Sequence, residues 1–217
     1  MLETSGRVES TSKATSTTER IASSHAGLCS ASSAWVVPWE RKRDAIVWRG
    51  QVRRNSNNSG QLQRLRLLQV SAALNRSLPE GQGRGQLDIA DPQLAGRMPG
   101  AVLLSGSRAV VAIDGWANEW NGLFFKLLGG SAILWVASER YRQWYHRELV
   151  PWKHYIPVRS DMSDLADRIK YVMNHSHARN ASLQRMAAEA RRVAMRLSLR
   201  TETARLRAHL LQRCGQV

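Results

Sequence analysis

An arginine–glycine pair and a long polar loop are the segments of this sequence best suited to hold a phosphate group. Arg49 and Gly50 follow the apolar run 45–48, and the loop 114–122 follows a second apolar run, 109–113. A loop that opens into a helix presents unpaired backbone N–H groups and a partial positive charge, which favour phosphate or pyrophosphate. A guanidinium can pair with two phosphate oxygens at once. These segments therefore indicate a phosphate or pyrophosphate site.

Several single residues have more than one interpretation. Asp114 could bind a ribose or a metal ion, or it could cap the turn at Gly115. Trp116 and Trp120 could stack on uracil or on a sugar, although tryptophan more often packs in a core. His154 stands among apolar residues, which favours a buried, hydrogen-bonded histidine over a ligand or a base.

No group of residues has the spacing of a metal site. His175 and His177 are close in sequence, but no carboxylate follows them at ligand spacing, so we expect a loop there. Cys29 and Cys214 lie near opposite ends of the chain, which leaves a single long-range disulfide open. We predict neither a metal nor a cofactor.

Short apolar runs alternate with helical patterns along most of the chain. We expect strands at residues 45–48, 87–89, 109–113, 132–136 and 154–158. We expect helices along the face of Leu62, Leu65 and Leu68 and at 123–128, 141–149, 163–174, 182–197 and 202–212, with an irregular segment at 91–100. This alternation predicts an α/β fold, a parallel sheet with helices on both faces. Ligands bind outside the carboxyl ends of such strands, where both loops would lie.

Composition divides the chain into a tail and one domain. Residues 1–33 are rich in serine and threonine and poor in large apolar residues, so we expect a disordered tail, with a transit peptide as the alternative. Residues 34–213 form the predicted domain, and 43% hydrophobic residues suffice for a core. The sequence contains no apolar run of about 20 residues and no apolar signal core, so it predicts neither a membrane span nor a secretory signal.

The net charge of +15 leaves a second function class open. A basic chain attracts polyanions, and a nucleic-acid-binding or polyanion-binding domain without catalytic activity is the alternative function. Many of the arginines lie in the last third, between alanines and leucines at helical spacing, which favours a solvated helix face. No RNA-binding aromatic motif, zinc finger or recognition helix accompanies the charge, so we expect no specific nucleic-acid partner.

One long string is similar to the signature of a known family. Residues 149–158, with the letters LVPWKHYIPV, resemble the signature of glycosyltransferase family 90, the capsule-associated-protein and protein O-glucosyltransferase (Rumi-like and KDEL-motif-containing) type. Further segments match in order, namely 38–50, 85–88, 114–131 and 161–165. The resemblance covers roughly residues 35–211 and rests on several segments together.

The resemblance implies a fold, an activity and partners. The fold would be a Rossmann-like domain, the C-terminal half of a two-domain GT-B glycosyltransferase. The activity would be transfer of glucose or xylose from UDP-glucose or UDP-xylose to a hydroxyl group on a protein or glycan acceptor. The family resemblance suggests the secretory pathway, in the lumen of the endoplasmic reticulum or Golgi.

The resemblance also implies a set of donor-binding residues. These residues occupy the turn after the first strand, one position in the helix that follows, and the long loop with its helix start: Arg49, Gly50, Gln51, Arg64, Asp114, Gly115, Asn118, Glu119, Trp120, Asn121, Gly122 and Leu123.

Three departures from the family pattern bear on activity. Relatives usually carry serine where this chain has Gln51, and many carry serine where it has Glu119. A carboxylate beside a pyrophosphate is unfavourable unless it faces away or holds a metal. The catalytic base of relatives lies in an N-terminal half that these 217 residues do not contain. We therefore expect a truncated donor-binding half that is weakly active or inactive alone.

Overall fold

The computed structural model describes residues 36–53, 55–77, 87–91, 100–119, 121–138, 140–175, 181–197 and 199–214. The chain divides into two units at Ala34 and Trp35, and every described residue belongs to the second unit. The predicted tail at 1–33 and the residues Trp120 and His177 lie outside the described residues.

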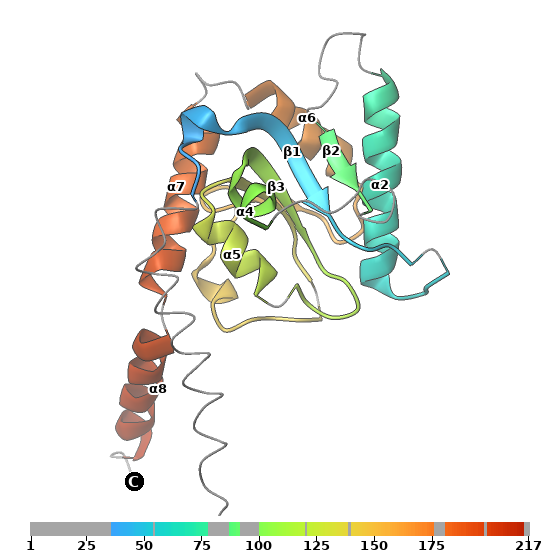
Figure 1. Cartoon of the computed structure of the whole chain (residues 1–217). Helices are drawn as coiled ribbons and strands as arrows, with labels where there is room; N and C mark the ends of the chain where they lie inside the picture. The colour runs from blue at the N-terminus through green and yellow to red at the C-terminus, as the bar shows by residue number, and fades with distance from the viewer. Residues whose placement is uncertain are drawn as a thin grey trace, which may run out of the picture. The chain divides into compact units, whose positions relative to one another are not determined.

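Five parallel strands form one sheet, as the sequence predicts (Figure 1). The strands are β1 (Arg43–Arg49), β2 (Leu87–Ala90), β3 (Ser107–Ile113), β4 (Ala132–Val136) and β5 (Ile156–Val158), in the order β2-β1-β3-β4-β5. Every residue of the central strand β3 and of its neighbour β4 is buried. Burial on both faces is typical of a parallel sheet, and it explains the continuous apolar runs of these strands.

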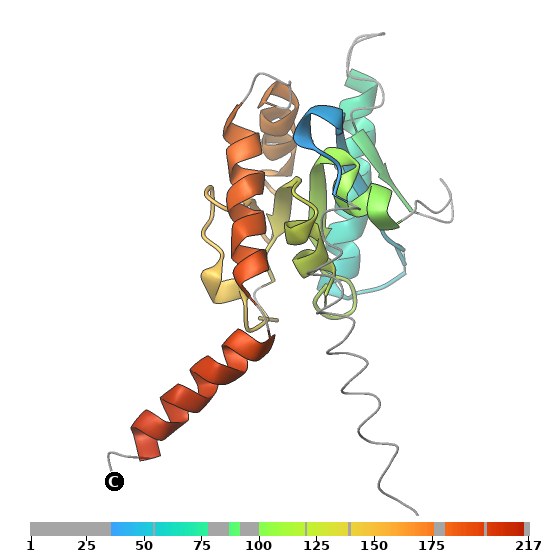
Figure 2. The same ribbon diagram turned by 60° about the vertical axis from the view of Figure 1, so that its left-hand side comes forward.

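Helices connect the strands and cover both faces of the sheet. They are α2 (Ser59–Ser77), α4 (Gly100–Ser105), α5 (Gly122–Leu128), α6 (Leu165–His175), α7 (Ala181–Arg196) and α8 (Leu199–Cys214), with the short 3-10 helices η1 (Trp39–Arg41) and η2 (His146–Glu148). Figures 1 and 2 show α2 and α6 on one side of the strands and α5 on the other.

Alternate residues of the strands contribute to two apolar clusters. Val111 and Ile113 of β3 pack in the cluster with α2 and α6, whereas Val110 and Ala112 pack in the cluster with α5 and the C-terminal half of α7. The Rossmann-like α/β fold class is therefore confirmed.

The segment 141–149, which we expected to be helical, forms only the short 3-10 helix η2. Its backbone hydrogen bonds run from His146 to Gln143, from Glu148 to Tyr145 and from Leu149 to His146, the spacing of a 3-10 helix. The backbone N–H of Gln143 donates to Nδ1 of His146 at 3.3 Å. Tyr145 is buried edge-on against Phe124 and His146. Aromatic packing has overridden the helical pattern.

The strand expected at 154–158 begins two residues later, at Ile156, because a turn precedes it. The turn is closed by the N–H of Trp152, which donates to the carbonyl of Tyr155, and Trp152 has a positive φ of 63°. His154 is buried, and its Nδ1 accepts a hydrogen bond from the N–H of Val150 at 2.9 Å. The prediction of a buried, hydrogen-bonded histidine is confirmed.

A buried lysine joins two helix ends beneath the sheet. Nζ of Lys42 donates to the carbonyl oxygen of Ser105, the last residue of α4, and to that of Gly129, which follows α5. It also donates to Oγ of Ser131. Burial, together with the positive charge of Arg191, lowers the pKa of Lys42 to about 8. A cation at the C-terminal end of a helix is favourable, because the last carbonyls there have no partner within the helix.

Candidate functional site

The predicted site residues come together where the strands end. The loop after β1 leads into α2, the next element along the chain. The loop after β3 lies beside the first turn of α2. A Cβ atom built on Gly60 of α2 would overlap the carbonyl oxygen of Gly115, so the helix start and the loop after β3 touch backbone to backbone. Only glycine permits so close an approach. This contact fixes one wall of the candidate site.

Arg64 connects the two loops. Its Nε donates to the carbonyl oxygen of Asp114 at 2.8 Å, and its Nη1 donates to that of Gln51 at 3.1 Å. The guanidinium also lies over the ring of Trp48, 5.7 Å from the centroid. Burial lowers the pKa of Arg64, and the neighbouring Asp114 opposes this effect. Arg64 thus places a cation at the carboxyl ends of β1 and β3, and its implied role in donor binding stays a prediction.

Asp114 holds the loop that follows β3. Its Oδ1 accepts a hydrogen bond from the N–H of Glu119 at 3.0 Å, and the N–H of Gly115 donates to Ala117. Burial raises the pKa of Asp114, whereas a hydrogen bond from Ser138 and the charge of Arg64 lower it. Asp114 thus closes the loop through the N–H of Glu119, while its predicted role in donor binding stays a prediction.

Glu119 forms a buried ion pair with Lys126 of α5. The carboxylate therefore has a partner of its own, which answers the concern that a carboxylate here would be adverse to a phosphate. Lys126 is absent from the residues predicted for the site. The sequence does place this lysine on the same helix face as Leu123 and Leu127, which indicates burial, and Glu119 precedes it as a possible partner.

Arg49 points sideways into the sheet. It pairs with the carboxylate of Asp88 on β2, and its Nη1 donates to the backbone carbonyls of Asp88 and Trp48, at 2.6 and 3.0 Å. The side chain is 10% exposed. A phosphate would have to compete with Asp88 for this guanidinium. Its predicted role as a phosphate ligand stays a prediction.

One aromatic ring at this edge faces solvent. Trp116 is 55% exposed, and the guanidinium of Arg53 lies 5.5 Å from the centre of its ring. Nδ2 of Asn58 donates to the carbonyl oxygen of Trp116, while Oδ1 of Asn58 accepts from the N–H of Gln61 in α2. The stacking role for Trp116 remains a prediction, and Trp120 lies outside the described residues.

The other predicted residues differ in exposure. Leu123 is buried in the cluster beneath α5, so its contribution is packing. Asn121 is exposed at the start of α5 and makes no side-chain cap, and Asn118 is half-buried. Gly50 is half-buried against the ring of Trp48.

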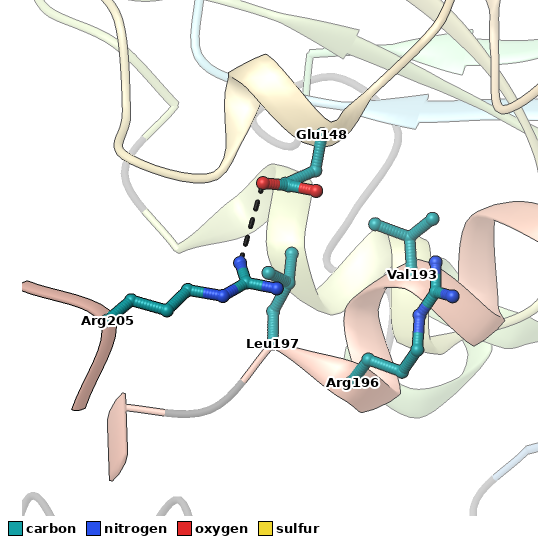
Figure 3. A pocket seen from close by; sticks show the side chains of 5 residues that line it. All are labelled: Glu148, Val193, Arg196, Leu197 and Arg205. Carbon is teal, nitrogen blue, oxygen red and sulfur yellow. Dashed lines mark ion pairs between the residues drawn. The ribbon is translucent and has the colours of Figure 1, made fainter. Parts of the chain in front are cut away.

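A cavity of about 180 Å³ lies at another place, between η2 and the junction of α7 with α8 (Figure 3). Its walls are Glu148, Val193, Arg196, Leu197 and Arg205, and Arg205 pairs with Glu148 across it at 3.5 Å. Pockets for drug-sized ligands measure about 300–1,000 Å³, so this cavity is small for a nucleotide sugar. None of its lining residues was predicted for the site.

The described residues contain neither a metal-binding cluster nor a membrane-spanning helix. No group of three or more histidine, cysteine or acidic side chains there could hold a metal ion. None of the described helices combines the length and the apolar character needed to cross a membrane.

Comparison with known proteins gives a match to one family model and to several relatives. The model of the family described as "Glycosyl transferase family 90" matches residues 26–213, so the match begins ahead of the domain boundary expected at residue 34. Protein O-glucosyltransferase 2 of Danio rerio is 27% identical over 140 residues, which are 63% of this chain and 26% of that protein. Protein O-glucosyltransferase 3 of Rattus norvegicus is 36% identical over 61 residues, 28% of this chain and 12% of that protein.

A viral protein is also similar. The uncharacterized protein 035R of Invertebrate iridescent virus 3 is 38% identical over 82 residues, which are 37% of this chain and 7% of the viral protein. The chain thus spans about a quarter or less of the length of each of these relatives.

Proposed function

This chain belongs to glycosyl transferase family 90, and from that membership we propose that its ordered domain binds the UDP-sugar donor of a glycosyl transfer to a hydroxyl group. The donor would be UDP-glucose or UDP-xylose. The acceptor would be a hydroxyl on a protein or glycan, in keeping with relatives that are named protein O-glucosyltransferases.

The observation that carries this proposal is the meeting of Arg64, the loop after β3 and the start of α2 at the carboxyl ends of β1 and β3. A guanidinium beside a helix start is suited to a diphosphate, because both offer N–H donors and positive charge. The exposed ring of Trp116, with Arg53 beside it, is suited to a flat base.

Donor binding alone does not transfer a sugar. Transfer needs a base on the acceptor hydroxyl and an acceptor held in line with the reactive carbon. The family resemblance assigns the base to a domain outside these 217 residues. We therefore propose that residues 1–217 by themselves bind donor weakly and turn it over slowly or not at all.

Calorimetric titration with UDP, UDP-glucose and UDP-xylose tests the proposal, with ADP as the control nucleotide. We expect saturable binding of the uridine nucleotides with Kd below about 1 mM, and weaker binding of ADP. A sugar-transfer assay on the same sample should give no robust turnover. Equal binding of ADP, or no binding of UDP at millimolar concentration, would contradict a UDP-sugar site.

A pair of arginine variants on one helix locates the site. Arg64→Ala should weaken UDP binding by about ten- to a hundredfold, because a charge-assisted contact at the strand ends is lost. Arg66→Ala is the matched control, since Arg66 is exposed on the same helix. If both variants weaken binding equally, diffuse positive charge explains the affinity, and the alternative of a general polyanion binder gains support.

A further inference from the structure

The ion pair between Glu119 and Lys126 is buried at the base of the loop that follows β3. The side chain of Lys126 is 8% exposed and that of Glu119 is 16% exposed. One oxygen of the Glu119 carboxylate meets Nζ of Lys126, while the other, Oε2, is buried without a hydrogen-bond partner among the described residues. An ion pair in such a place does not by itself stabilise a fold, because removing two charges from water is costly.

Glu119 is attached to its surroundings at three points. Its N–H donates to Asp114 at the start of the loop, and its carbonyl oxygen accepts from the N–H of Gly122 at the start of α5. Its carboxylate reaches one turn further, to Lys126. A Cβ atom at position 122 would overlap the Glu119 side chain, so Gly122 leaves the space that this side chain occupies. The backbone and the side chain of one residue thus connect both ends of the loop.

Four charged groups face one another here, from three elements. Arg64 comes from α2, Asp114 and Glu119 from the loop, and Lys126 from α5. Their formal charges cancel as two cations and two anions. Burial, together with the positive charge of Arg64, lowers the pKa of Lys126 to about 7. Removal of either member of the pair would leave an unbalanced charge in the protein interior.

We propose that Glu119 and Lys126 are positioning residues: their ion pair sets the conformation of the loop 114–121 and thereby the affinity of the donor site. The inference rests on the proposed function. Neither side chain contacts the donor in this proposal. The pair acts through the loop, which carries the exposed ring of Trp116 and lies against Arg64 and the start of α2.

The test is a double-mutant cycle with Glu119→Gln, Lys126→Gln and the two changes together. Affinity for UDP is measured by calorimetry at a temperature where circular dichroism shows every variant folded. Each single change should raise Kd about tenfold, since a loop displaced by an unpaired buried charge loses binding geometry. The double variant should return to within about threefold of the unaltered chain, because two amides can share a hydrogen bond and no charge remains unpaired.

Hydrogen exchange, measured without any nucleotide, reports the loop directly. The amides of Gly115, Glu119 and Gly122 should exchange faster in both single variants and recover in the double variant. The matched control is the exposed ion pair of Glu189 with Arg192 on α7, where Glu189→Gln should change neither exchange in the loop nor Kd. If Glu119→Gln does not fold, Glu119→Asp serves instead, because it keeps the charge and shortens the reach to Lys126.

Two results would overturn the inference. Unchanged loop exchange in the folded single variants would show that the pair does not hold the loop. Additive effects on Kd, with no recovery in the double variant, would show that each residue acts separately, as a ligand contact would. If the unaltered chain does not bind UDP at all, the proposed function fails, and so does the claim that the ion pair sets donor affinity. The exchange measurement still tests whether the pair holds the loop.

Discussion

Arg49 at the end of β1 and Arg64 in α2 show how the neighbours of a charged side chain decide its role. Arg49 and Arg64 were both expected to reach a phosphate. Arg49 is occupied by the carboxylate and the carbonyl of Asp88, while the described hydrogen bonds of Arg64 go to two uncharged carbonyl oxygens. A carbonyl competes with a phosphate far less than a carboxylate does, because it carries only a partial charge. Arg64 is accordingly the stronger candidate for a phosphate contact.

The pairing of Arg49 with Asp88 leads to a stability prediction. Arg49→Met should lower the free energy of unfolding by about 2–4 kcal/mol, because it leaves a partly buried Asp88 without its closest partner. Arg43→Met is the matched control: Arg43 pairs with the same carboxylate at 3.2 Å but is 48% exposed, so its loss should cost less than about 1 kcal/mol. Urea unfolding of both variants measures the difference. Equal losses would mean that burial does not decide the value of these pairs.

Some residues could not have been assigned from sequence, and the reason is physical. Lysine is almost never fully buried unless it is paired, so the sequence around Lys42 does not indicate burial, and for Lys126 only the apolar neighbours Leu123 and Leu127 do. Their partners are carbonyls at two helix ends and a carboxylate seven positions away, which only the folded chain brings together. By contrast, Asp114 was identifiable as a candidate, because it stands directly after a strand and within a segment that matches the family.

At the scale of elements, apolar runs predicted the strands well, whereas the helical pattern of an aromatic segment gave a wrong prediction. Residues 109–113 and 132–136 are buried on both faces, so their sequence had to be continuously apolar. Residues 141–149 contain Tyr145 and His146, whose rings pack against Phe124 and Trp135, and this packing leaves only one short 3-10 turn. The start of α2 touches the site loop through Gly60, a contact between distant segments that no local pattern reveals.

That contact gives a prediction for α2. Gly60→Ala should destabilise the fold by about 1–3 kcal/mol and weaken UDP binding, because the new methyl group pushes the helix away from the Gly115 carbonyl. Gly100→Ala is the control, since a Cβ atom on Gly100, the first residue of α4, meets nothing within 4 Å. The control should be neutral or slightly stabilising, by up to about 1 kcal/mol. Thermal unfolding measures the stability of both variants, and calorimetry measures their affinity for UDP. A Gly60→Ala variant with full stability and full affinity would refute the close packing.

At the scale of the whole molecule, part of the positive charge near the C-terminus is paired with acidic side chains. Arg192 pairs with Glu189 within α7 and Arg205 with Glu202 within α8. Arg147 pairs with Glu202 and Arg205 with Glu148, and these two pairs join α8 to η2. This pairing is what a solvated helix face requires, and it leaves less free charge for a polyanion than the net charge of +15 suggests.

The helix α8 should contribute little to the stability of the domain. None of its described side chains belongs to either apolar cluster, and Leu206 and Leu211 are exposed. Ion pairs of Glu202 and Arg205 with Arg147 and Glu148 connect α8 to η2, and each is worth up to about 1 kcal/mol because both arginines are more than half exposed. Deletion of residues 198–217 should thus lower the free energy of unfolding by less than about 2 kcal/mol and leave the affinity for UDP unchanged.

Deletion of residues 181–217 is the contrasting variant, because α7 carries the fully buried Leu183 and Ala190, and we expect that variant not to fold. Urea unfolding followed by fluorescence measures both. If the shorter deletion also abolished cooperative unfolding, α8 would be part of the core, and the domain boundary would have to lie at its end.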